Sequence, residues 1–343
     1  MLEIIDTSQN ERWDKIVRSM HAYDFYHLSA YHRLDTSGQP LLLYCQTNTD
    51  AFALPIIVRD IPHSIYKDIT SVYGYAGPLS QTANPSAAAI GLFHEALKTC
   101  FDANRIVSMF TRLHPLFRGQ LNRQANLLSG LGEIVDLNRT IAIDLTLPEA
   151  EQRRQYSHSL KNDINHLKKI LTVKEAKSKA DIDAFVDIYY ENMKRVNASE
   201  TYFFSKEYFY QFLETIDSTL LLAVYNGQII SGSLFTACHG IVQSHLSATH
   251  SEYLHLSPIK YIWDYMRILA CENGNAVFHL GGGFGGKDDS LFAFKSQFSK
   301  CRFVFQTGRY IHNQACYEQL VAERFNNEVP LSAYFPLYRL HQL

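Results

Sequence analysis

Apolar residues in the second half of the chain recur at helical spacing in two long stretches. Over 181–196, one face collects Ile182, Phe185, Ile188 and Tyr189. Over 257–273, the same spacing predicts a helix that Ser257-Pro258 begins and Gly274 ends. Its buried stripe should consist of Ile259, Ile262, Trp263, Met266, Leu269 and Ala270, with Lys260, Asp264, Arg267 and Glu272 facing solvent.

Between these two helices the pattern changes to that of strands. A polar loop with Asn197, Glu200 and Tyr202 leads to a helix expected over 206–216. Strands are expected over 220–225, 228–237 and 241–249, and Asn226-Gly227, a strong hairpin signal, joins the first two. After the second helix, a short apolar run over 276–280 predicts one more buried strand.

The first half shows a looser version of this order. We expect a helix over 9–22, strands over 41–45, 51–58 and 106–112, and a helix that Asn84-Pro85 begins and that ends near 104. The segment 66–79 contains YGYAGPLS, which is aromatic and glycine-rich and typical of a loop that lines a cleft. Residues 114–132 are expected to be irregular, with short strands over 134–137 and 140–145.

A polar segment separates the two halves. Pro148 opens a helix expected to run to Leu171, and the domain boundary is expected near 150. This helix carries the densest basic run of the chain, which usually marks a solvated face; the alternative is a surface that meets phosphates. The run consists of Arg153, Arg154, Lys161, Lys168 and Lys169.

The stretch 276–300 holds the first candidate for chemistry. Glycines at 281, 282, 283, 285 and 286 follow the predicted strand, and glycine lets a backbone turn sharply and approach a ligand closely. If 290–298 is helical, Lys295 shares the core-facing stripe with Leu291, Phe294 and Phe298. A lysine among apolar neighbours is costly unless it is paired or its pKa falls, so Lys295 is a site candidate. The alternative is a lysine whose ammonium reaches solvent along its own methylenes.

Composition narrows the class of protein. With 343 residues, two domains are the natural expectation. A net charge of −2 does not indicate a general nucleic-acid binder. The six cysteines lack a C-x-x-C pair, which fits reduced thiols, and the N-terminus lacks the apolar region of a signal peptide. We therefore expect a cytoplasmic protein without a transmembrane segment.

The order of helix, helix, antiparallel meander, crossover helix and strand is that of the GNAT acyltransferase fold. In that fold, the strand before the crossover helix diverges from the strand after it, and the donor lies in the opening. The first half repeats the order loosely, which predicts an α/β (α+β) protein with tandem GNAT-like domains, each a mixed, mostly antiparallel sheet flanked by helices. We expect domains at 1–150, joined by the C-terminal segment 318–343, and at 151–317.

Several segments, in this order, resemble the Fem-type peptidyl- and aminoacyltransferases and the related BioF2-like acetyltransferase domain. They are YGYAGP in the first half, and FVDIYYENMKRVNASETYFFS, LAVYNGQIISGSLF, HLSATHSEYLHLSP and HLGGGFGGKDDSLFAFKSQFS in the second. The resemblance implies transfer of an aminoacyl group from charged tRNA, or of an acyl group from coenzyme A, onto an amine of a cell-envelope peptide or saccharide precursor. It also implies a phenylalanine–lysine pair in which the lysine stabilises the oxyanion, matched here by Phe294 and Lys295.

One departure from the GNAT pattern bears on the donor. Enzymes that use coenzyme A usually carry R/Q-x-x-G-x-G/A at the start of the crossover helix, so that backbone amides surround the pyrophosphate. Here the corresponding HLSPIKYI has no glycine. This favours aminoacyl-tRNA over acyl-CoA as donor; neither is a bound cofactor.

The resemblance also implies which residues hold the acceptor. They are Lys161, Arg195, Tyr202, Tyr253, His279, Gly281, Gly282, Gly283, Tyr73 and Tyr75. The expected partners are a nucleotide-activated or lipid-linked envelope precursor and charged tRNA, with no DNA and with peripheral attachment to a membrane left open. No base is evident: His279 and His245 are candidates, each more typical of a core or hydrogen-bonded histidine.

Other functions compete with this interpretation. The runner-up donor, acyl-CoA, would make the protein an N-acetyltransferase of surface polysaccharide biosynthesis. A non-catalytic relative that binds glycans is an alternative of another class. The run from Gly281 to Asp288 approaches a P-loop but has Asp288 where Ser or Thr belongs. His245, His250 and His279 lack the carboxylate or thiol spacing that would complete a metal site.

Overall fold

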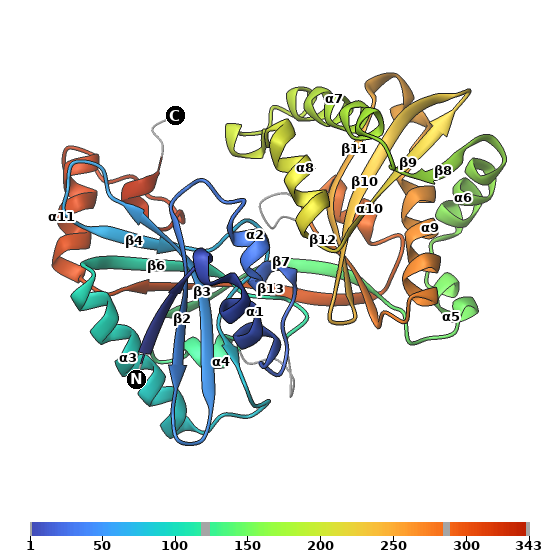
Figure 1. Cartoon of the computed structure of the whole chain (residues 1–343). Coiled ribbons are helices and arrows are strands. Elements are labelled where there is room, and N and C mark those ends of the chain that lie inside the picture. The colour runs from blue at the N-terminus through green and yellow to red at the C-terminus, as the bar shows by residue number, and fades with distance from the viewer. Residues whose placement is uncertain (1, 118–123, 284–288, 341–343) are drawn as a thin grey trace. The chain divides into compact units, whose positions relative to one another are not determined.

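The computed structural model describes residues 2–117, 124–283 and 289–340. Two compact units are present (Figure 1): the first comprises Met1–Asn138 and Val304–Leu343, and the second comprises Arg139–Phe303. The C-terminal segment thus belongs to the first unit, from residue 304 onward. The expected boundary near 150 falls inside the second unit.

The second unit contains one mixed sheet with the strand order β7-β12-β11-β10-β9-β8. Neighbouring strands are antiparallel except β11 and β12, which are parallel and joined through helix α9. The strands are β7 (Glu133–Asp144), which begins in the first unit, β8 (Thr172–Glu175), β9 (Ser218–Tyr225), β10 (Gln228–Cys238), β11 (Ile241–Thr249) and β12 (Val277–Gly282). The mixed sheet flanked by helices confirms the predicted fold class.

Helices cover both faces of this sheet (Figure 1). A Cβ at Gly232 would meet Phe185 of α7, whereas Trp263 of α9 donates from Nε1 to Ser233 Oγ at 3.3 Å. Successive strand residues point to opposite faces, so α7 and α9 pack on opposite sides of β10. The helices are α5 (Glu149–Arg154), α6 (His158–Ile170), α7 (Lys179–Arg195), α8 (Lys206–Thr215), α9 (Ile259–Glu272) and α10 (Ser290–Lys295).

Helix α9 corrects one prediction. Its stripe of Ile262, Trp263, Met266 and Ala270 is buried in the core as expected. Asp264 and Arg267, expected in solvent, are 0% and 1% exposed. Asp264 pairs with Arg267 at 3.2 Å, with Lys168 of α6 at 2.9 Å and with Arg153 of α5 at 3.4 Å. Charged partners from three helices therefore make their burial tolerable.

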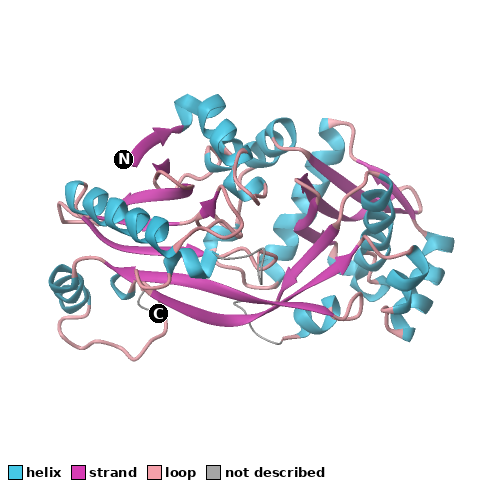
Figure 2. Cartoon of the chain, turned by 90° about the horizontal axis from the view of Figure 1, so that it is seen from below, coloured by secondary structure: helices cyan, strands magenta, loops and turns pink. Residues whose placement is uncertain are grey.

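The first unit is built on the strand order β1-β2-β3-β4-β6-β13, with β5 beside β3. Only β4 and β6 are parallel, and α3 connects them. The strands are β1 (Leu2–Asp6), β2 (Gln39–Gln46), β3 (Ala51–Asp60), β4 (Lys67–Thr70), β5 (Leu79–Ser80), β6 (Ile106–Arg112) and β13 (Cys301–Ile311), which begins in the second unit. Its helices are α1 (Asn10–Arg18), α2 (Ser29–His32), α3 (Ala87–Ala103), α4 (Gln124–Leu128) and α11 (Gln314–Arg324); as in the second unit, helices flank the strands (Figure 2).

Four further boundaries differ from prediction for local reasons. The segment 66–79 contains strands β4 and β5, and 134–145 forms one strand, β7, rather than two. The helix expected from Pro148 to Leu171 is divided because Ser157 caps a new helix, its Oγ accepting from Leu160 N. Ser86, rather than Asn84, caps α3. Strand β1 had no sequence signal that we recognised.

The Asp264 cluster gives a stability prediction. Burial by itself would raise the Asp264 pKa, but the hydrogen bond from Lys168 and the charges of Arg267, Lys168 and Arg153 outweigh it and lower the pKa. Asp264→Ala should lower the free energy of unfolding by about 3–5 kcal/mol, because Arg267 stays buried with only the exposed Glu149 as a carboxylate partner. Because the folded-state pKa lies below the unfolded value of about 3.9, the wild-type contribution is present above that pH and is lost as pH falls.

Denaturant unfolding between pH 3 and pH 7 (roughly the range over which a carboxylate loses its charge) measures both effects. The matched control is Asp163→Ala, because Asp163 pairs with Lys260 at 2.6 Å but its side chain is 43% exposed. This control should change the free energy of unfolding by at most about 1 kcal/mol. Equal losses in the two variants would contradict the assignment.

Candidate functional site

Strands β11 and β12 run side by side for only part of their length. Residues 241–243 of β11 pair with residues 277–279 of β12. Beyond this pairing, β11 continues to Thr249 and β12 continues to Gly282. On its other side β12 pairs with β7 along its whole length, and beyond His279 this pairing continues from Gly281 and Gly282 to Ile141 and Thr140. The two strands therefore diverge on either side of the crossover helix α9, as the order of elements predicts.

Two of the glycines have a structural reason at this divergence. The pairing of β12 with β7 shifts register between His279 and Gly281, which is a β-bulge, and Gly281 has a φ of +77° that favours glycine. A Cβ on Gly282 would lie 2.8 Å from the carbonyl oxygen of Arg139. Gly283 follows the strand and is partly buried. The glycines at 285 and 286 lie outside the described residues.

Lys295 ends the short helix α10, which Asp289 caps by accepting from Phe292 N at 2.8 Å. Its Nζ donates to the carbonyl oxygen of Gly282 at 2.7 Å. Burial lowers the Lys295 pKa to about 8, against the opposing charge of Asp289. The ammonium is thus held at the bulge of β12 and is easily deprotonated for a lysine.

The apolar surroundings of Lys295 are only partly those predicted. Phe294 packs on Trp263 with ring centroids 5.5 Å apart, and Phe298 is fully buried. Leu291 is 42% exposed, because α10 ends at Lys295 and no single helical stripe extends from 291 to 298.

The two histidines considered as bases are buried. His279 is 0% exposed and its Nδ1 lies 2.6 Å from Gln243 Oε1 on the paired strand. His245 contacts the Tyr208 hydroxyl through Nε2 at 3.1 Å and stacks on Phe212. Burial lowers the His245 pKa to about 3, so its ring is neutral at pH 7. These contacts are typical of core or hydrogen-bonded histidines rather than of a catalytic base.

The end of β11 gathers two of the expected substrate residues. His250 pairs with Glu191 at 3.5 Å and its ring lies 5.7 Å from that of Tyr253. The Tyr253 hydroxyl donates to Gln228 Oε1 at 3.1 Å. Glu191 also accepts from Ser251 N, and its pKa is lowered by this bonding to Ser251 and by the charges of His250 and Arg195. Arg195 and Tyr253 therefore belong to one polar group at the start of the crossover.

Lys161 and Tyr202 make their described contacts elsewhere. Lys161 donates from Nζ to the carbonyl of Arg154 at 3.4 Å, and the Tyr202 carbonyl accepts from the Tyr189 hydroxyl at 2.7 Å. The basic run to which Lys161 belongs is not uniformly solvated, since Arg153 and Lys168 reach the buried Asp264. These contacts lie on α5, α6 and α7 rather than on α10.

Tyr73 and Tyr75 lie in the first unit, on a segment held by buried polar groups. The Tyr73 carbonyl accepts from the Tyr31 hydroxyl at 2.7 Å, and the Ala76 carbonyl accepts from Gln124 Nε2 at 3.1 Å. The ring of Tyr75 lies 5.9 Å from that of His114. Gly74 has a φ of +114°, and a Cβ there would clash with the ring of Tyr26.

Behind this segment lies a buried polar network that the sequence did not reveal. His114 and Asp24 pair at 2.9 Å with both side chains 0% exposed, and His114 N donates to Gln124 Oε1 at 2.5 Å. His27 is also fully buried, and its pKa falls to about 4 because of burial and the charge of His114. The Asp24 and Leu116 contacts engage both nitrogens of His114, which assigns this ring a structural role.

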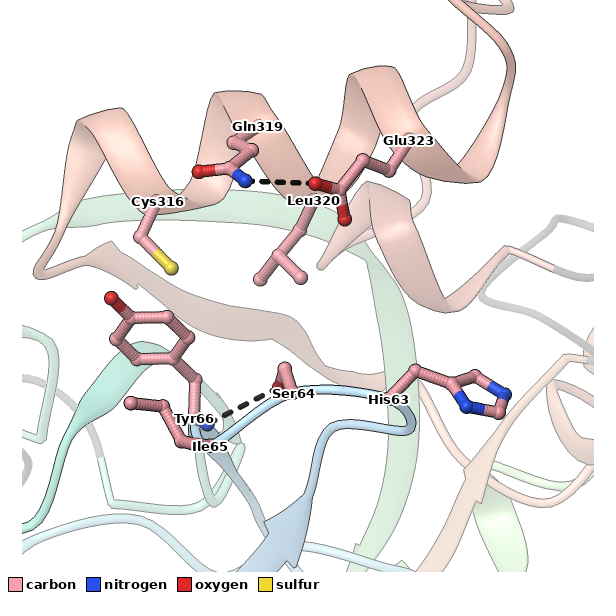
Figure 3. Close-up of a pocket in the computed structure, with 8 residues that line it drawn as sticks. All are labelled: His63, Ser64, Ile65, Tyr66, Cys316, Gln319, Leu320 and Glu323. Carbon is pink, nitrogen blue, oxygen red and sulfur yellow. Dashed lines mark hydrogen bonds between the residues drawn. The ribbon is translucent and has the colours of Figure 1, made fainter.

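The first unit also contains a cavity of about 560 Å³ between the β3–β4 turn and α11 (Figure 3). Tyr66, Cys316 and Leu320 form apolar walls, and Gln319 donates to Glu323 at 2.8 Å along the helix. Burial raises the Cys316 pKa, so this thiol is not activated. Lys295 belongs to the other unit, and the cavity supplies no residue of the predicted site.

The described part of the chain contains no group of three or more His, Cys, Asp or Glu side chains placed to hold a metal ion. Its helices include none that is long and apolar enough to cross a membrane.

The start of α9 offers few backbone amides to a ligand. Ser257, with a φ of +53°, donates its N–H to Leu254 O at 3.0 Å, and Lys260 N–H donates to Ser257 O at 3.1 Å. Residue 258 is proline, which has no N–H. The amides that would surround a pyrophosphate here are therefore largely used within the chain.

Residues 152–295 match the family model described as the acetyltransferase (GNAT) domain, and the match ends at Lys295. A search among curated proteins gives no match to the chain. The fold is similar to a crystal structure of FemX, with 13% identity, coverage of 92% of this chain and 99% of that chain, and a TM-score of 0.72.

Two further solved structures share the fold. L-PGS from Bacillus licheniformis is 13% identical, with 91% of this chain and 95% of that chain covered and a TM-score of 0.59. The C-terminal domain of a putative lysylphosphatidylglycerol synthetase from Agrobacterium fabrum is 14% identical, with 90% and 93% covered and a TM-score of 0.57. At these identities the likeness concerns the fold. The chain thus contains a GNAT-type domain, has a Fem-like fold and is an acyltransferase, as predicted.

The buried network gives a prediction about the Tyr73–Tyr75 segment. In Asp24→Asn, the single amide oxygen can accept from Phe25 N–H or from His114 Nε2–H but its amide nitrogen then faces the other, so one buried group is left without its hydrogen bond. Hydrogen exchange of residues 71–80 should become faster by about tenfold or more, since an unsatisfied buried group costs about 1–3 kcal/mol. Exchange in α7 should not change, and Asp35→Asn, which removes an exposed turn carboxylate, is the control. Unchanged exchange in 71–80 would rule out this role of the network.

Proposed function

We propose that this chain transfers an aminoacyl group from aminoacyl-tRNA onto an amino group of a cell-envelope peptide or saccharide precursor. The observation that carries the proposal is the Lys295 ammonium, held at the β12 bulge beside the divergence of β11 and β12. Its pKa of about 8 fits a group that donates to a developing negative charge. The Fem-like fold supports the same reaction class by analogy.

The reaction needs little beyond positioning and charge stabilisation. The acceptor amine attacks the ester carbonyl carbon, and a C–N bond forms while the carbonyl oxygen becomes negative. Lys295 exchanges its hydrogen bond to Gly282 O for one to this oxyanion. The C–O bond to the terminal ribose then breaks, and the ribose hydroxyl leaves with a proton that the amine has lost.

The choice of donor is based on the backbone amides at the N-terminus of α9. In coenzyme A-dependent enzymes of this fold, backbone amides at this point surround the pyrophosphate, whereas here Ser257 and Lys260 donate within the chain and residue 258 is proline. An aminoacyl-tRNA donor makes no such demand. Acyl-CoA remains the second candidate, because the matched family model is that of an acetyltransferase domain.

Substitution of Lys295 tests the chemistry. Lys295→Met should lower kcat by about 10²–10³-fold, the usual cost of losing one oxyanion donor. The melting temperature should fall little, since the variant removes a partly buried charge. Single-turnover transfer with labelled aminoacyl-tRNA measures the rate, and Lys177→Met, an exposed lysine of the same unit, is the control. Wild-type turnover in Lys295→Met would exclude Lys295 from the reaction.

The pH dependence of transfer should be bell-shaped. The rate rises with pH as the acceptor amine loses its proton, and it falls as Lys295 loses its own near a pKa of about 8. Lys295→Arg should keep the ascending limb and move the descending limb above the accessible range, because arginine stays protonated. A descending limb that persists in the arginine variant must come from another group.

Calorimetric titration with acetyl-coenzyme A separates the two donors. We expect no saturable binding at micromolar concentrations, and transfer only with aminoacyl-tRNA. Saturable micromolar binding of acetyl-coenzyme A would replace the tRNA donor by acyl-CoA and leave the role of Lys295 intact.

A further inference from the structure

The outward face of helix α6 carries basic and amide side chains and no carboxylate. On the opposite face, Leu160, Ile164 and Leu167 are buried in the core of the second unit, where α6 lies beside α9 (Figure 1). The outward side chains recur at i, i+3, i+4, i+7, i+8 and i+11, which is one continuous stripe of a helix. They form what we call the α6 stripe: His158, Lys161, Asn162, Asn165, His166 and Lys169.

The two lysines of the stripe have no carboxylate partner in the described part of the chain. Asp163, the acidic residue of α6, lies off the stripe and pairs with Lys260 at 2.6 Å. A solvated helix face commonly mixes the two signs of charge, because opposite charges at i, i+4 stabilise a helix and like charges do not. A stripe of one sign, in a chain with a net charge of −2, therefore indicates a negatively charged partner.

The end of α5 extends the positive charge of the stripe. Arg154 is exposed, and its carbonyl accepts from Lys161 Nζ at 3.4 Å, which brings Lys161 to the turn between α5 and α6. Of the two carboxylates of α5, Glu149 pairs with Arg267 at 3.1 Å and Glu151 is exposed. Positive charge therefore exceeds negative charge on this surface.

The stripe fits the backbone of double-stranded RNA better than it fits a lipid surface. It contains no apolar side chain, whereas a helix that binds a bilayer inserts an apolar face into it. Its two asparagines stand between Lys161 and Lys169, and an amide can both donate to and accept from a ribose 2′-hydroxyl. The wide, shallow minor groove of A-form RNA presents 2′-hydroxyls and phosphates. A stripe about 16 Å long, at the rise of an α-helix, can contact both kinds of group at once.

The stripe begins beside the segment that carries Lys295. Ser157, which caps α6, donates its N–H to the carbonyl of Gln297 at 2.9 Å. Gln297 is two residues beyond Lys295, so at most about 7 Å of chain separates them. A double helix bound along the stripe would thus have one end close to Lys295. In a charged tRNA, a short single strand joins the acceptor helix to the aminoacyl ester.

We propose that the α6 stripe, together with Arg154, binds the acceptor helix of a tRNA donor through its phosphates and 2′-hydroxyls. The inference rests on the proposed function and names for it the surface that holds the helical part of the donor. The surface recognises the shape of an RNA helix and needs no base-specific contact. Lys161, which the resemblance assigns to the acceptor, is thereby assigned to the donor.

Fluorescence anisotropy tests the surface with a labelled RNA hairpin that has the length of an acceptor helix and carries no amino acid. Lys161→Gln combined with Lys169→Gln should weaken binding by about tenfold and reduce the steepness of log affinity against log salt by about two, because two phosphate contacts are lost. The matched control, Lys177→Gln combined with Lys194→Gln, changes two exposed lysines of the same unit and should alter affinity less than about twofold. Equal losses in the two double variants, or a wild-type protein that does not bind the hairpin, would overturn the proposal.

A DNA hairpin of the same sequence tests the contacts with the 2′-hydroxyls. The wild-type protein should bind the RNA hairpin more tightly, and Asn162→Ala combined with Asn165→Ala should remove most of that preference without changing the salt dependence. Equal wild-type affinities for the two hairpins would contradict recognition of RNA. Vesicles that contain phosphatidylglycerol are the competing ligand. Binding to them that requires Lys161 and Lys169, in a protein that does not bind the hairpin, would assign the stripe to a membrane surface instead.

Transfer assays make the inference and the proposed function fail separately. With aminoacyl-tRNA, the Lys161 and Lys169 double variant should raise KM about tenfold and leave kcat within about twofold, because the stripe does not touch the reacting atoms. With a short aminoacylated oligonucleotide that lacks the helix, the variant should behave as the wild type. An unchanged KM for aminoacyl-tRNA would refute the inference and leave the proposed function standing.

The converse outcome is also distinct. Hairpin binding that depends on the stripe, without any aminoacyl transfer, would support the RNA surface and refute the proposed reaction. Circular dichroism and melting temperature of each variant confirm that it is folded.

Discussion

The separation of β12 from β11 beyond His279 is the constraint on which the candidate site depends. Strand β12 pairs with β7 along its whole length, through a bulge at Gly281, but its pairing with β11 ends at His279. This geometry opens the sheet next to α9 and leaves the Gly282 carbonyl to accept from Lys295. A side chain at Gly282 would push against the Arg139 carbonyl. The position of Lys295 therefore depends both on the glycine at 282 and on the divergence of the strands.

The second unit treats two buried charges in opposite ways. Asp264 is surrounded by Arg267, Lys168 and Arg153, and its pKa is lowered, so it stays ionised and stabilises the fold. Lys295 donates to a carbonyl, and burial lowers its pKa against the charge of Asp289. An ionisable side chain whose pKa is shifted by burial beside a strand divergence is typical of a functional site.

Local signals in the sequence were enough to predict most elements and to single out Lys295 as a candidate. The hairpin at Asn226-Gly227, the β11–α9–β12 crossover and the lysine among apolar residues all follow from spacing within one segment. The failures concern contacts between distant segments. The helical pattern of 257–273 predicts Asp264 and Arg267 in solvent because it contains no information on the packing of α5 and α6. Likewise, no residue near His114 in the sequence indicates its pairing with Asp24. The contacts of Arg139 and Arg302 with the Phe292 ring likewise depend on two strands far apart in sequence.

The two units share a plan but differ beside their parallel pairs of strands. In the first unit, β4 and β6 form the parallel pair on either side of the crossover helix α3, as β11 and β12 do around α9. There the chain binds itself: Arg339 donates to the buried Asp68 of β4 at 2.8 Å, and the Tyr338 hydroxyl meets Ser108 of β6 at 2.7 Å. The C-terminal residues Tyr338 and Arg339 thus contact both β4 and β6. The second unit does not include this C-terminal segment. A ligand between these two strands of the first unit would have to displace a buried ion pair, which agrees with the proposal that the donor binds in the second unit.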